Sequence, residues 1–243
     1  MSALRTNSVR TTVILPAAGT GTRFGAALPK QFVPLLDVPI IVRTLQIFEQ
    51  TPAIDAVVIA ASPDFHDHIT ALKEQFHLQK IVAVVEGGKE RQDSILNALK
   101  TSVCAASDIV LVHDAVRPMI TPEFIATIVE AAAIHGAAVP GLVPKETIKE
   151  CRVEAEGGVT VQTTHERSRL RAIQTPQGFR RELLLAAYHK AHESGFLGTD
   201  DASVVEFAGF SVAVVPGLEE NIKITTPLDF RWAEWLLRSV ATA

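Results

Sequence analysis

Residues 11–32 read Thr-Thr-Val-Ile-Leu-Pro-Ala-Ala-Gly-Thr-Gly-Thr-Arg-Phe-Gly-Ala-Ala-Leu-Pro-Lys-Gln-Phe. The β-branched run at the start predicts a buried strand, and the small residues after it predict a loop. Glycine lacks a Cβ, so backbone N–H groups in such a loop can come close to an anion. Two cations follow, Arg23 and Lys30. The stretch therefore predicts a strand that ends at a site for a nucleotide triphosphate.

The spacing of these glycines excludes two common nucleotide-binding loops. A P-loop needs Gly-x-x-x-x-Gly-Lys-[Ser/Thr], and no such run occurs in the chain. A dinucleotide-binding loop needs Gly-x-Gly-x-x-Gly at the start of a helix, but Phe24 stands at the third glycine position and Pro29 interrupts a long helix. An ordinary strand-to-helix turn would explain the glycines alone. The two cations and the Lys-Gln-Phe run favour the anion site.

The composition is that of a globular protein. The chain has 243 residues, of which 47% are hydrophobic and 21% charged, so we expect residues 1–243 to form a single α/β domain. A net charge of −4 argues against a protein that coats nucleic acid. The N-terminus has no apolar core typical of a signal peptide, and no run of about eighteen apolar residues predicts a membrane span. Cys104 and Cys151 lack a nearby partner, which favours reduced thiols and a cytoplasmic location.

Short apolar runs alternate with amphipathic stretches along most of the chain. This alternation predicts a mostly parallel sheet with helices on both faces, and ligands in such sheets bind at the carboxyl ends of the strands. The opening loop, residues 113–118 and the turn after Val215 should therefore share one edge. The predicted strands are Thr12–Leu15, Ala56–Ala60, Ile81–Val85, Asp108–Val112, Ala137–Val143 and Val212–Val215. The predicted helices are Pro39–Glu49, Asp64–Phe76, Arg91–Lys100, Pro122–His135, Arg180–Glu193, Asp200–Phe207 and Pro227–Val240.

Residues 144–175 depart from this alternation. They are polar and rich in β-branched residues, and Glu154-Ala-Glu-Gly-Gly158 predicts a hairpin turn. A two-stranded arm cannot bury its own face, so it tends to pack on a partner. The pattern predicts a projecting β-arm rather than a linker.

Two further segments carry polar residues that suit a ligand site. Asp114 and Arg117 follow an apolar strand, where they can bind a polyol, a ribose or a phosphate, or can instead form an ion pair that stabilises a turn. Gly87 and Gly88 follow another strand and permit close approach to a base or sugar, and Ser94 lies one helical turn beyond them.

Other polar residues allow a structural explanation. Lys223 lies between two isoleucines, which suits either an anion site or an edge-strand charge that prevents aggregation. The adjacent Asp200 and Asp201 suit helix capping better than metal binding or acid–base chemistry. Thr175-Pro176 predicts the start of a helix, and His66 and His68 lack the spacing of a zinc site.

Taken together and in this order, the segments resemble the 2-C-methyl-D-erythritol 4-phosphate cytidylyltransferases of the non-mevalonate isoprenoid pathway. The resemblance extends from about Val13 to Pro227. It implies a Rossmann-like nucleotidyltransferase fold, a homodimer formed through the β-arm, CTP with Mg²⁺ held mainly by the CTP phosphates, no protein metal site, and release of pyrophosphate. The segments that carry it are 16–25 with 29–32, 87–94, 113–118, 146–149, 175–179, 199–204 and 221–227.

Matching positions carry the family's residue roles onto this chain. The resemblance implies that Arg23, Lys30 and Lys223 act on the reacting phosphates as catalytic cations. Residues implied to contact CTP are Ala17, Ala18, Gly19, Gly21, Gly88 and Ser94. Residues implied to contact methylerythritol phosphate are Asp114, Arg117, Thr147, Arg167 and Thr175, with Arg167 reaching the site of the neighbouring subunit.

The chemistry implied is attack by a phosphate oxygen of the acceptor on the α-phosphorus of CTP. A phosphate monoester is already ionised at neutral pH, so positioning and charge neutralisation carry the catalysis and no general base is needed. A ribitol 5-phosphate cytidylyltransferase, a sugar-1-phosphate nucleotidyltransferase and a non-catalytic nucleotide-binding protein remain as alternatives. Thr20, Thr22 and Glu146 depart from the residues usual in the family.

Overall fold

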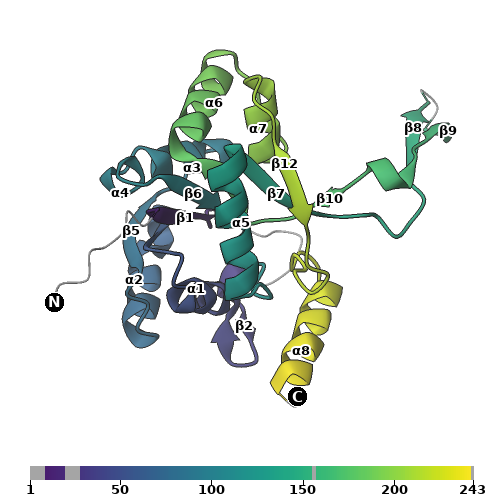
Figure 1. The fold of residues 1–243 in the computed structure, drawn as a ribbon. Helices are drawn as coiled ribbons and strands as arrows, with labels where there is room; N and C mark the ends of the chain where they lie inside the picture. Colours follow the sequence, from purple (N-terminus) through teal and green to yellow (C-terminus); the bar gives the residue numbers. More distant parts are fainter. Residues whose placement is uncertain (1–8, 20–27, 155–156, 242–243) are drawn as a thin grey trace.

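The computed structural model describes residues 9–19, 28–154 and 157–241. Within these ranges eight strands form one sheet in the order β10-β7-β11-β6-β1-β4-β5, and β12 pairs with the remaining edge of β7 (Figure 1). The strands of this sheet are β1 (Thr11–Pro16), β4 (Ala56–Ala61), β5 (Ile81–Glu86), β6 (Ile109–Val112), β7 (Ala137–Leu142), β10 (Ala172–Ile173), β11 (Gln177–Arg180) and β12 (Ala213–Pro216). The predicted α/β class with a mostly parallel core is confirmed.

The first strand lies in the middle of the sheet. β1 is parallel to β4 on one side and to β6 on the other, with Val13 opposite Val57 and Leu111. All three strands are buried on both faces, as their unbroken apolar sequences predict. Because parallel strands end at the same edge, the residues that follow β1 and β6 are brought together.

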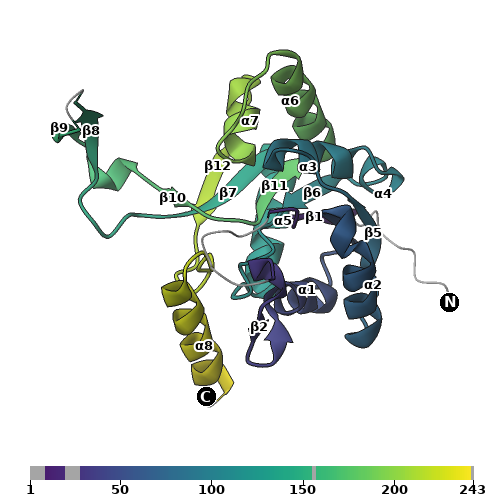
Figure 2. The same cartoon turned by 180° about the vertical axis from the view of Figure 1, so that it is seen from behind.

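Helices cover both faces of the sheet (Figures 1 and 2). Alternate residues of β1 point to opposite sides, so Val13 and Leu15 pack with one layer and Ile14 with the other. The first layer holds α1 (Ile40–Gln50), α2 (His66–Gln75) and α5 (Pro122–His135). The second holds α3 (Arg91–Leu99), α4 (Ser102–Ala105), α6 (Arg181–Glu193) and α7 (Asp201–Phe207).

The prediction that Thr175-Pro176 starts a helix is wrong, although the helix predicted at Arg180–Glu193 is confirmed as α6. Thr175-Pro176 leads into β11, an antiparallel strand inserted between β6 and β7, and α6 begins only at Arg181. Phe179 is fully buried against the second helix layer, so tertiary packing outweighs the local Thr-Pro signal. Besides β11, the short elements outside the predicted set are α4, 3₁₀ helices at Lys30–Phe32, Pro63–Phe65 and Arg167–Arg169, and the hairpin of β2 (Pro34–Leu35) with β3 (Val38–Pro39).

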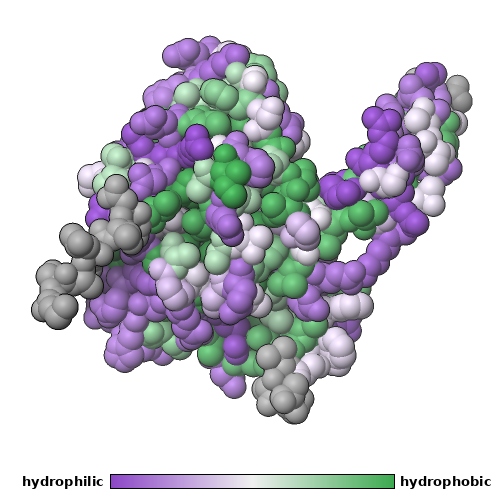
Figure 3. Space-filling model, in the orientation of Figure 1, coloured by the Kyte–Doolittle hydropathy of each residue, from purple (hydrophilic) through white to green (hydrophobic). Residues whose placement is uncertain are grey.

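The predicted arm is an isolated antiparallel hairpin. Its strands, β8 (Lys149–Val153) and β9 (Val159–Thr164), pair only with each other among the described residues, and every residue in them is exposed. The turn forms where predicted, with the Gly157 N–H donating to the Glu154 carbonyl. Figure 3 shows the arm standing clear of the body.

The last helix, α8 (Pro227–Ala241), packs beside the β2–β3 hairpin through Ala233, which is fully buried. Its opposite side carries Leu228, Trp232 and Trp235, which are 55%, 58% and 63% exposed. None of the helices in the described part of the chain has the length and apolar character needed to cross a membrane.

Candidate active site

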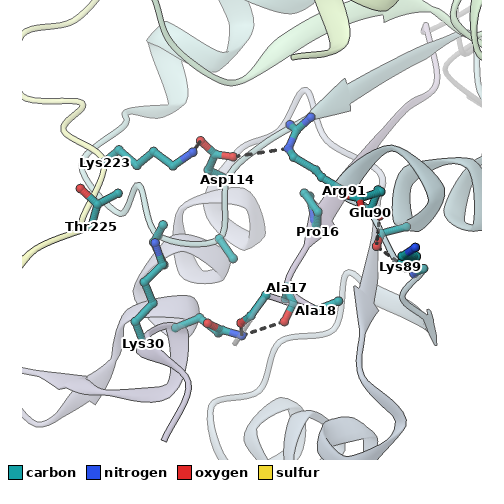
Figure 4. A pocket seen from close by; sticks show the side chains of 16 residues that line it. Pro16, Ala17, Ala18, Lys30, Lys89, Glu90, Arg91, Asp114, Lys223 and Thr225 are labelled. Atoms are coloured by element: carbon teal, nitrogen blue, oxygen red, sulfur yellow. Dashed lines mark hydrogen bonds and ion pairs between the residues drawn. The ribbon is translucent and has the colours of Figure 1, made fainter. Parts of the chain in front are cut away.

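A cavity of about 320 Å³ opens at the carboxyl edge of the sheet (Figure 4). Within the described residues its walls come from five segments: the end of β1 with the loop that follows it, the 3₁₀ helix at Lys30–Phe32, the start of α3, the turn after β6, and the segment before α8. This edge is where the alternating strand pattern places a ligand. The lining residues are Pro16–Gly19, Lys30, Gln31, Gly88–Arg91, Ser94, Asp114–Val116, Lys223 and Thr225.

The loop after β1 is held from behind by Gln31. The Gln31 Nε2 donates to the carbonyls of Ala17 at 2.7 Å and Gly19 at 3.2 Å, and the Ala17 N–H donates to the Ala60 carbonyl at 2.7 Å. Ala17 therefore lines the cavity without offering its N–H. Within the described part of the loop, Ala18 and Gly19 also line the cavity, and the structure shows no hydrogen bond from their N–H groups to another described residue, so they are the candidates to face an anion. Gly21 and Arg23 lie outside the described residues.

Lys30 enters the cavity from a short 3₁₀ helix. Its neighbours Gln31 and Phe32 are buried, and Phe32 stacks on Phe65 with ring centroids 4.9 Å apart. The burial of Gln31 and Phe32 fixes the backbone from which the Lys30 side chain extends. Lys30 and Lys223 approach the cavity from the same side as Thr225 (Figure 4).

The Gly87–Gly88 pair is required by contacts within the chain. A Cβ on Gly87 would lie 2.4 Å from the Ala18 Cβ, and one on Gly88 would lie 2.1 Å from the Asp93 Cβ. The Gly88 N–H donates to Ser94 Oγ at 2.9 Å, and Ser94 Oγ donates to the Glu90 carbonyl. Glycine thus lets the start of α3 close against the β1 loop, and Ser94 fixes that closure.

Asp114 is the electrostatic centre of the site. Its carboxylate lies 3.0 Å from Lys223 Nζ, 3.2 Å from Arg117 Nε and 3.9 Å from Arg91 Nε. Burial by itself would raise the pKa of Asp114, but the three cations outweigh burial and hold that pKa well below its usual range. Asp114 is therefore ionised at every physiological pH. An ionised carboxylate accepts hydrogen bonds from hydroxyl groups and repels phosphate.

The predicted substrate residues divide into two groups. Arg117 and Thr175 lie behind Asp114: Arg117 also donates to the Asn221 carbonyl at 2.7 Å, and Thr175 Oγ1 accepts from the Asp114 N–H at 3.1 Å. Thr147 and Arg167 lie outside the cavity of their own chain, and Arg167 donates to the Lys145 carbonyl in the arm.

His113 supports Asp114 from the core. It is fully buried, its Nε2 lies 3.1 Å from the Arg117 carbonyl, and its Nδ1 lies 3.1 Å from Thr175 Oγ1. Burial lowers the pKa of His113 to about 4, because little solvent is present to stabilise the charged ring. The imidazole is therefore neutral at neutral pH and acts as a hydrogen-bonding support.

This burial predicts a pH dependence of stability. Between about pH 4 and the unfolded value of about 6.5, the unfolded chain binds a proton at His113 and the folded chain does not, so unfolding becomes easier as the pH falls. From pH 7.5 to pH 5 we expect His113 to remove about 2 kcal/mol of unfolding free energy. Urea titrations of the wild type and of His113→Gln measure this, since the variant should lack that part of the slope. Equal slopes would contradict it.

Sequence reasoning missed Arg91 and underestimated Asp201. Asp200 caps α7 as predicted, with its Oδ1 accepting from the Ser203 N–H. Asp201, however, is fully buried: it accepts from Arg91 Nη2 at 2.7 Å and from the Tyr188 hydroxyl. Arg91 lies 110 positions away in the sequence, so no local pattern could reveal this pair. In the sequence, Arg91 is marked only as a basic residue three positions after Gly88, at the start of the predicted helix.

The described residues contain no group of three or more His, Cys, Asp or Glu side chains able to hold a metal ion. His66 Nε2 instead contacts the Ala61 carbonyl, and the His68 ring meets the edge of Phe32.

Two anionic reactants can share so small a cavity only if cations from several segments offset their repulsion. Lys30, Lys223 and Arg91 meet this condition at the carboxyl edge of a Rossmann-like sheet. Such a combination suits an enzyme that brings two anionic phosphates together, as nucleotidyltransferases do.

Comparison with known proteins identifies the family within that class. The sequence model for 2-C-methyl-D-erythritol 4-phosphate cytidylyltransferase matches residues 11–239. The chain is 46% identical over 235 residues to the enzyme of that name from Acidobacterium capsulatum, covering 95% of this chain and 98% of the relative. It is 44% identical over 227 residues to the one from Bacillus cereus, covering 93% and 97%.

Solved structures agree. The crystal structure of 2-C-methyl-D-erythritol 4-phosphate cytidylyltransferase from Thermus thermophilus superimposes with a TM-score of 0.75 at 33% identity, covering 93% of this chain and 98% of that one. The 4-diphosphocytidyl-2C-methyl-D-erythritol synthase of Anaerococcus prevotii gives a TM-score of 0.81 at 28% identity, covering 96% and 100%. The chain belongs to the 2-C-methyl-D-erythritol 4-phosphate cytidylyltransferase family.

Proposed function

We propose that the cavity at the carboxyl edge of the sheet is where this chain carries out its family's reaction. The chain transfers a cytidylyl group from CTP to 2-C-methyl-D-erythritol 4-phosphate, giving 4-diphosphocytidyl-2-C-methyl-D-erythritol and pyrophosphate for isoprenoid synthesis by the non-mevalonate pathway. The observation that carries the assignment of the site is the gathering of Lys30, Lys223 and Arg91 around one cavity beside the β1 loop.

The nucleotide takes the β1 side of the cavity. The N–H groups of Ala18 and Gly19 face the triphosphate with Lys30, and the base lies against Gly88 and the start of α3, which Ser94 stabilises. Gly21 and Arg23 follow in the same stretch of sequence, outside the described residues, and we propose that they also bind the triphosphate.

The acceptor takes the Asp114 side. Because Asp114 is ionised, it accepts hydrogen bonds from the polyol hydroxyls and keeps the acceptor phosphate away from itself. Lys223, which contacts Asp114 and lines the same cavity, draws the phosphate towards the α-phosphorus. Arg117 and Thr175 hold Asp114 in place from behind.

The residues present fit a metal that the substrate itself carries. Two carboxylates from the described residues line the cavity, Glu90 and Asp114. Asp114 is already paired with cations, and the described residues form no cluster of three carboxylates or imidazoles there, so phosphate oxygens are the suitable ligands for Mg²⁺. When bound to CTP, Mg²⁺ neutralises the charge on the triphosphate. Lys30 and Lys223 then orient the reacting phosphates in line, and the ionised acceptor phosphate attacks without a general base.

An assay with CTP, Mg²⁺ and two acceptors tests this function. We expect pyrophosphate release with methylerythritol phosphate and at least about tenfold lower kcat/KM with ribitol 5-phosphate. Preference for ribitol 5-phosphate would make the chain a pentitol-phosphate cytidylyltransferase. Release with neither acceptor would reject the proposal.

We further propose the cytoplasm as the location, in keeping with the two free cysteines.

The arm suggests that a second copy completes the site. Thr147 and Arg167 lie outside the cavity of their own chain, and the exposed hairpin buries none of its apolar residues, among them Val153, Val159 and Val161. An isolated hairpin of this kind is marginally stable in water. A homodimer in which each arm brings Arg167 to the partner's cavity accounts for both facts.

Mixing two inactive variants tests the exchange. Arg167→Ala subunits lack the arm cation and Lys30→Ala subunits lack the cavity cation, so neither homodimer has a complete site. After unfolding and refolding an equal mixture, about a quarter of all sites should be complete, because half the dimers are mixed and each has one intact site. Absence of recovery, with mixed dimers detected by size and tag, would reject the exchanged arm.

A further inference from the structure

Asp201 is a charged residue in the interior of the molecule. Its side chain is fully buried at the start of α7, where it accepts hydrogen bonds from the Tyr188 hydroxyl of α6 and from Arg91 Nη2 of α3. Burial, followed by the charge of Asp201, raises the pKa of Tyr188, so the phenol keeps its proton and remains a donor. One carboxylate thus ties together three helices of the second layer.

Arg91 connects this hydrogen-bonded cluster of Asp201 and Tyr188 to the cavity. Nη2 is bonded to Asp201 at 2.7 Å, while Nε lies 3.9 Å from Asp114 Oδ1, beyond hydrogen-bonding distance. The side chain is 34% exposed and lines the cavity, with the guanidinium facing Asp114 across from Lys223 (Figure 4). Asp201 therefore holds the guanidinium near Asp114 without allowing the two to close.

A buried ion pair is a poor means of stabilising a fold. Removing two charges from water costs several kcal/mol, and apolar residues of similar size at such positions are often as stabilising or more so. The pair of Arg91 and Asp201 instead specifies where one planar cation lies. Only an arginine can contact both carboxylates through separate nitrogens.

We infer that Asp201 is a positioning residue that acts through Arg91 to keep the Asp114 carboxylate open for the hydroxyl groups of the acceptor. Without Asp201, the guanidinium moves the short distance to Asp114 and forms a closed ion pair with it. Lys223 and Arg117 contact Oδ2 of Asp114, so Oδ1 is the oxygen that should receive a substrate hydroxyl, and the guanidinium then occupies it. This inference rests on the proposed function, which places the acceptor against Asp114.

Two substitutions test the inference by kinetics. Asp201→Asn keeps the shape but removes the anchoring charge, and Arg91→Lys keeps a cation for Asp201 but cannot reach both carboxylates. Asp201→Asn should raise the KM for methylerythritol phosphate by about tenfold or more, the loss expected for a hydrogen bond to a charged group. Arg91→Lys should change that KM by less than about twofold, because its ammonium stays with Asp201 and leaves Asp114 open. The KM for CTP should change by less than about twofold, because Asp201 and its guanidinium act on the acceptor side.

The double variant separates positioning from independent effects. If Asp201 acts through Arg91, then removing the guanidinium as well, in Asp201→Asn combined with Arg91→Met, should return the acceptor KM to within about threefold of the wild-type value. A double variant whose acceptor KM is as high as that of Asp201→Asn would overturn the inference. If Asp201→Asn does not fold, Asp201→Glu decides: it keeps the buried charge but its longer side chain pushes the guanidinium towards Asp114, so an unchanged acceptor KM would reject the role.

Val205→Ala is the matched control for stability. Val205 is fully buried on α7, contacts the same helix layer and lies outside the cavity. It should lower the unfolding free energy while leaving both KM values unchanged. A rise in its acceptor KM would show that loosening α7 is enough and would overturn the specific role of Asp201. Failure of the proposed function is distinguishable, because the wild type would then transfer no cytidylyl group.

Discussion

Replacing Lys30 by alanine is expected to lower kcat by about a thousandfold, with a much smaller rise in the KM for CTP. Lys30 stands on a 3₁₀ helix fixed by buried Gln31 and Phe32, and it lines the cavity where the β1 loop faces the triphosphate. The charge on the departing pyrophosphate increases during the reaction, so a fixed cation there stabilises the transition state more than the ground state. Steady-state kinetics at saturating acceptor, with CTP varied, measures both constants.

Lys100→Ala provides the control for the loss of one positive charge. Lys100 is exposed at the far end of α3, away from the cavity, and its removal should leave kcat unchanged. Unchanged kcat for Lys30→Ala, with only weaker CTP binding, would refute the catalytic role and leave Lys30 as a simple binding residue.

Replacing Asp114 by asparagine is expected to lower the free energy of unfolding by about 4 kcal/mol at pH 7. The change leaves Lys223, Arg117 and Arg91 close together without their common counter-charge. The acceptor should also bind more weakly, because an amide accepts fewer hydrogen bonds than a carboxylate. Chemical denaturation gives the first quantity and the acceptor KM gives the second.

The pH dependence separates this effect from that of His113. A carboxyl group with a depressed pKa contributes its stability above the unfolded value of about 4, and loses it as the pH falls through the lower folded value. The difference between Asp114→Asn and the wild type should therefore be equal at pH 7.5 and pH 5, whereas the His113 contribution changes over that range. A difference that shrinks markedly by pH 5 would mean that the cations do not depress the pKa of Asp114.

Local sequence patterns predicted the elements that depend on local interactions. The apolar run before the small-residue loop gave β1, Thr121-Pro122 gave the start of α5, and Glu154 to Gly158 gave the turn of the arm. Each is determined by residues within a few positions of one another. Strand alternation also placed the loop after β1 and the turn that holds Asp114 at one edge of the sheet, where the structure has the cavity.

Long-range contacts account for what the patterns missed. β11 pairs with strands on both sides, and its burial against them outweighs the Thr-Pro signal that favoured a helix. The capping preference of two adjacent aspartates was correct for Asp200 and gave no sign that Asp201 meets Arg91 from a distant helix. The exact use of each N–H in the β1 loop likewise depends on Gln31 and Ala60, which approach only in the folded chain.

The placement of the aromatic residues has a consequence for spectroscopy. Both tryptophans of the chain, Trp232 and Trp235, lie on the solvent side of α8, whereas its single tyrosine, Tyr188, is buried against Asp201. Indole emission therefore reports on the outer side of one helix, and we expect a red-shifted maximum that acrylamide quenches readily in the folded protein. Unfolding of the central sheet should therefore change the tryptophan emission maximum very little, whereas a molecule that binds over α8 should shift that maximum to shorter wavelength.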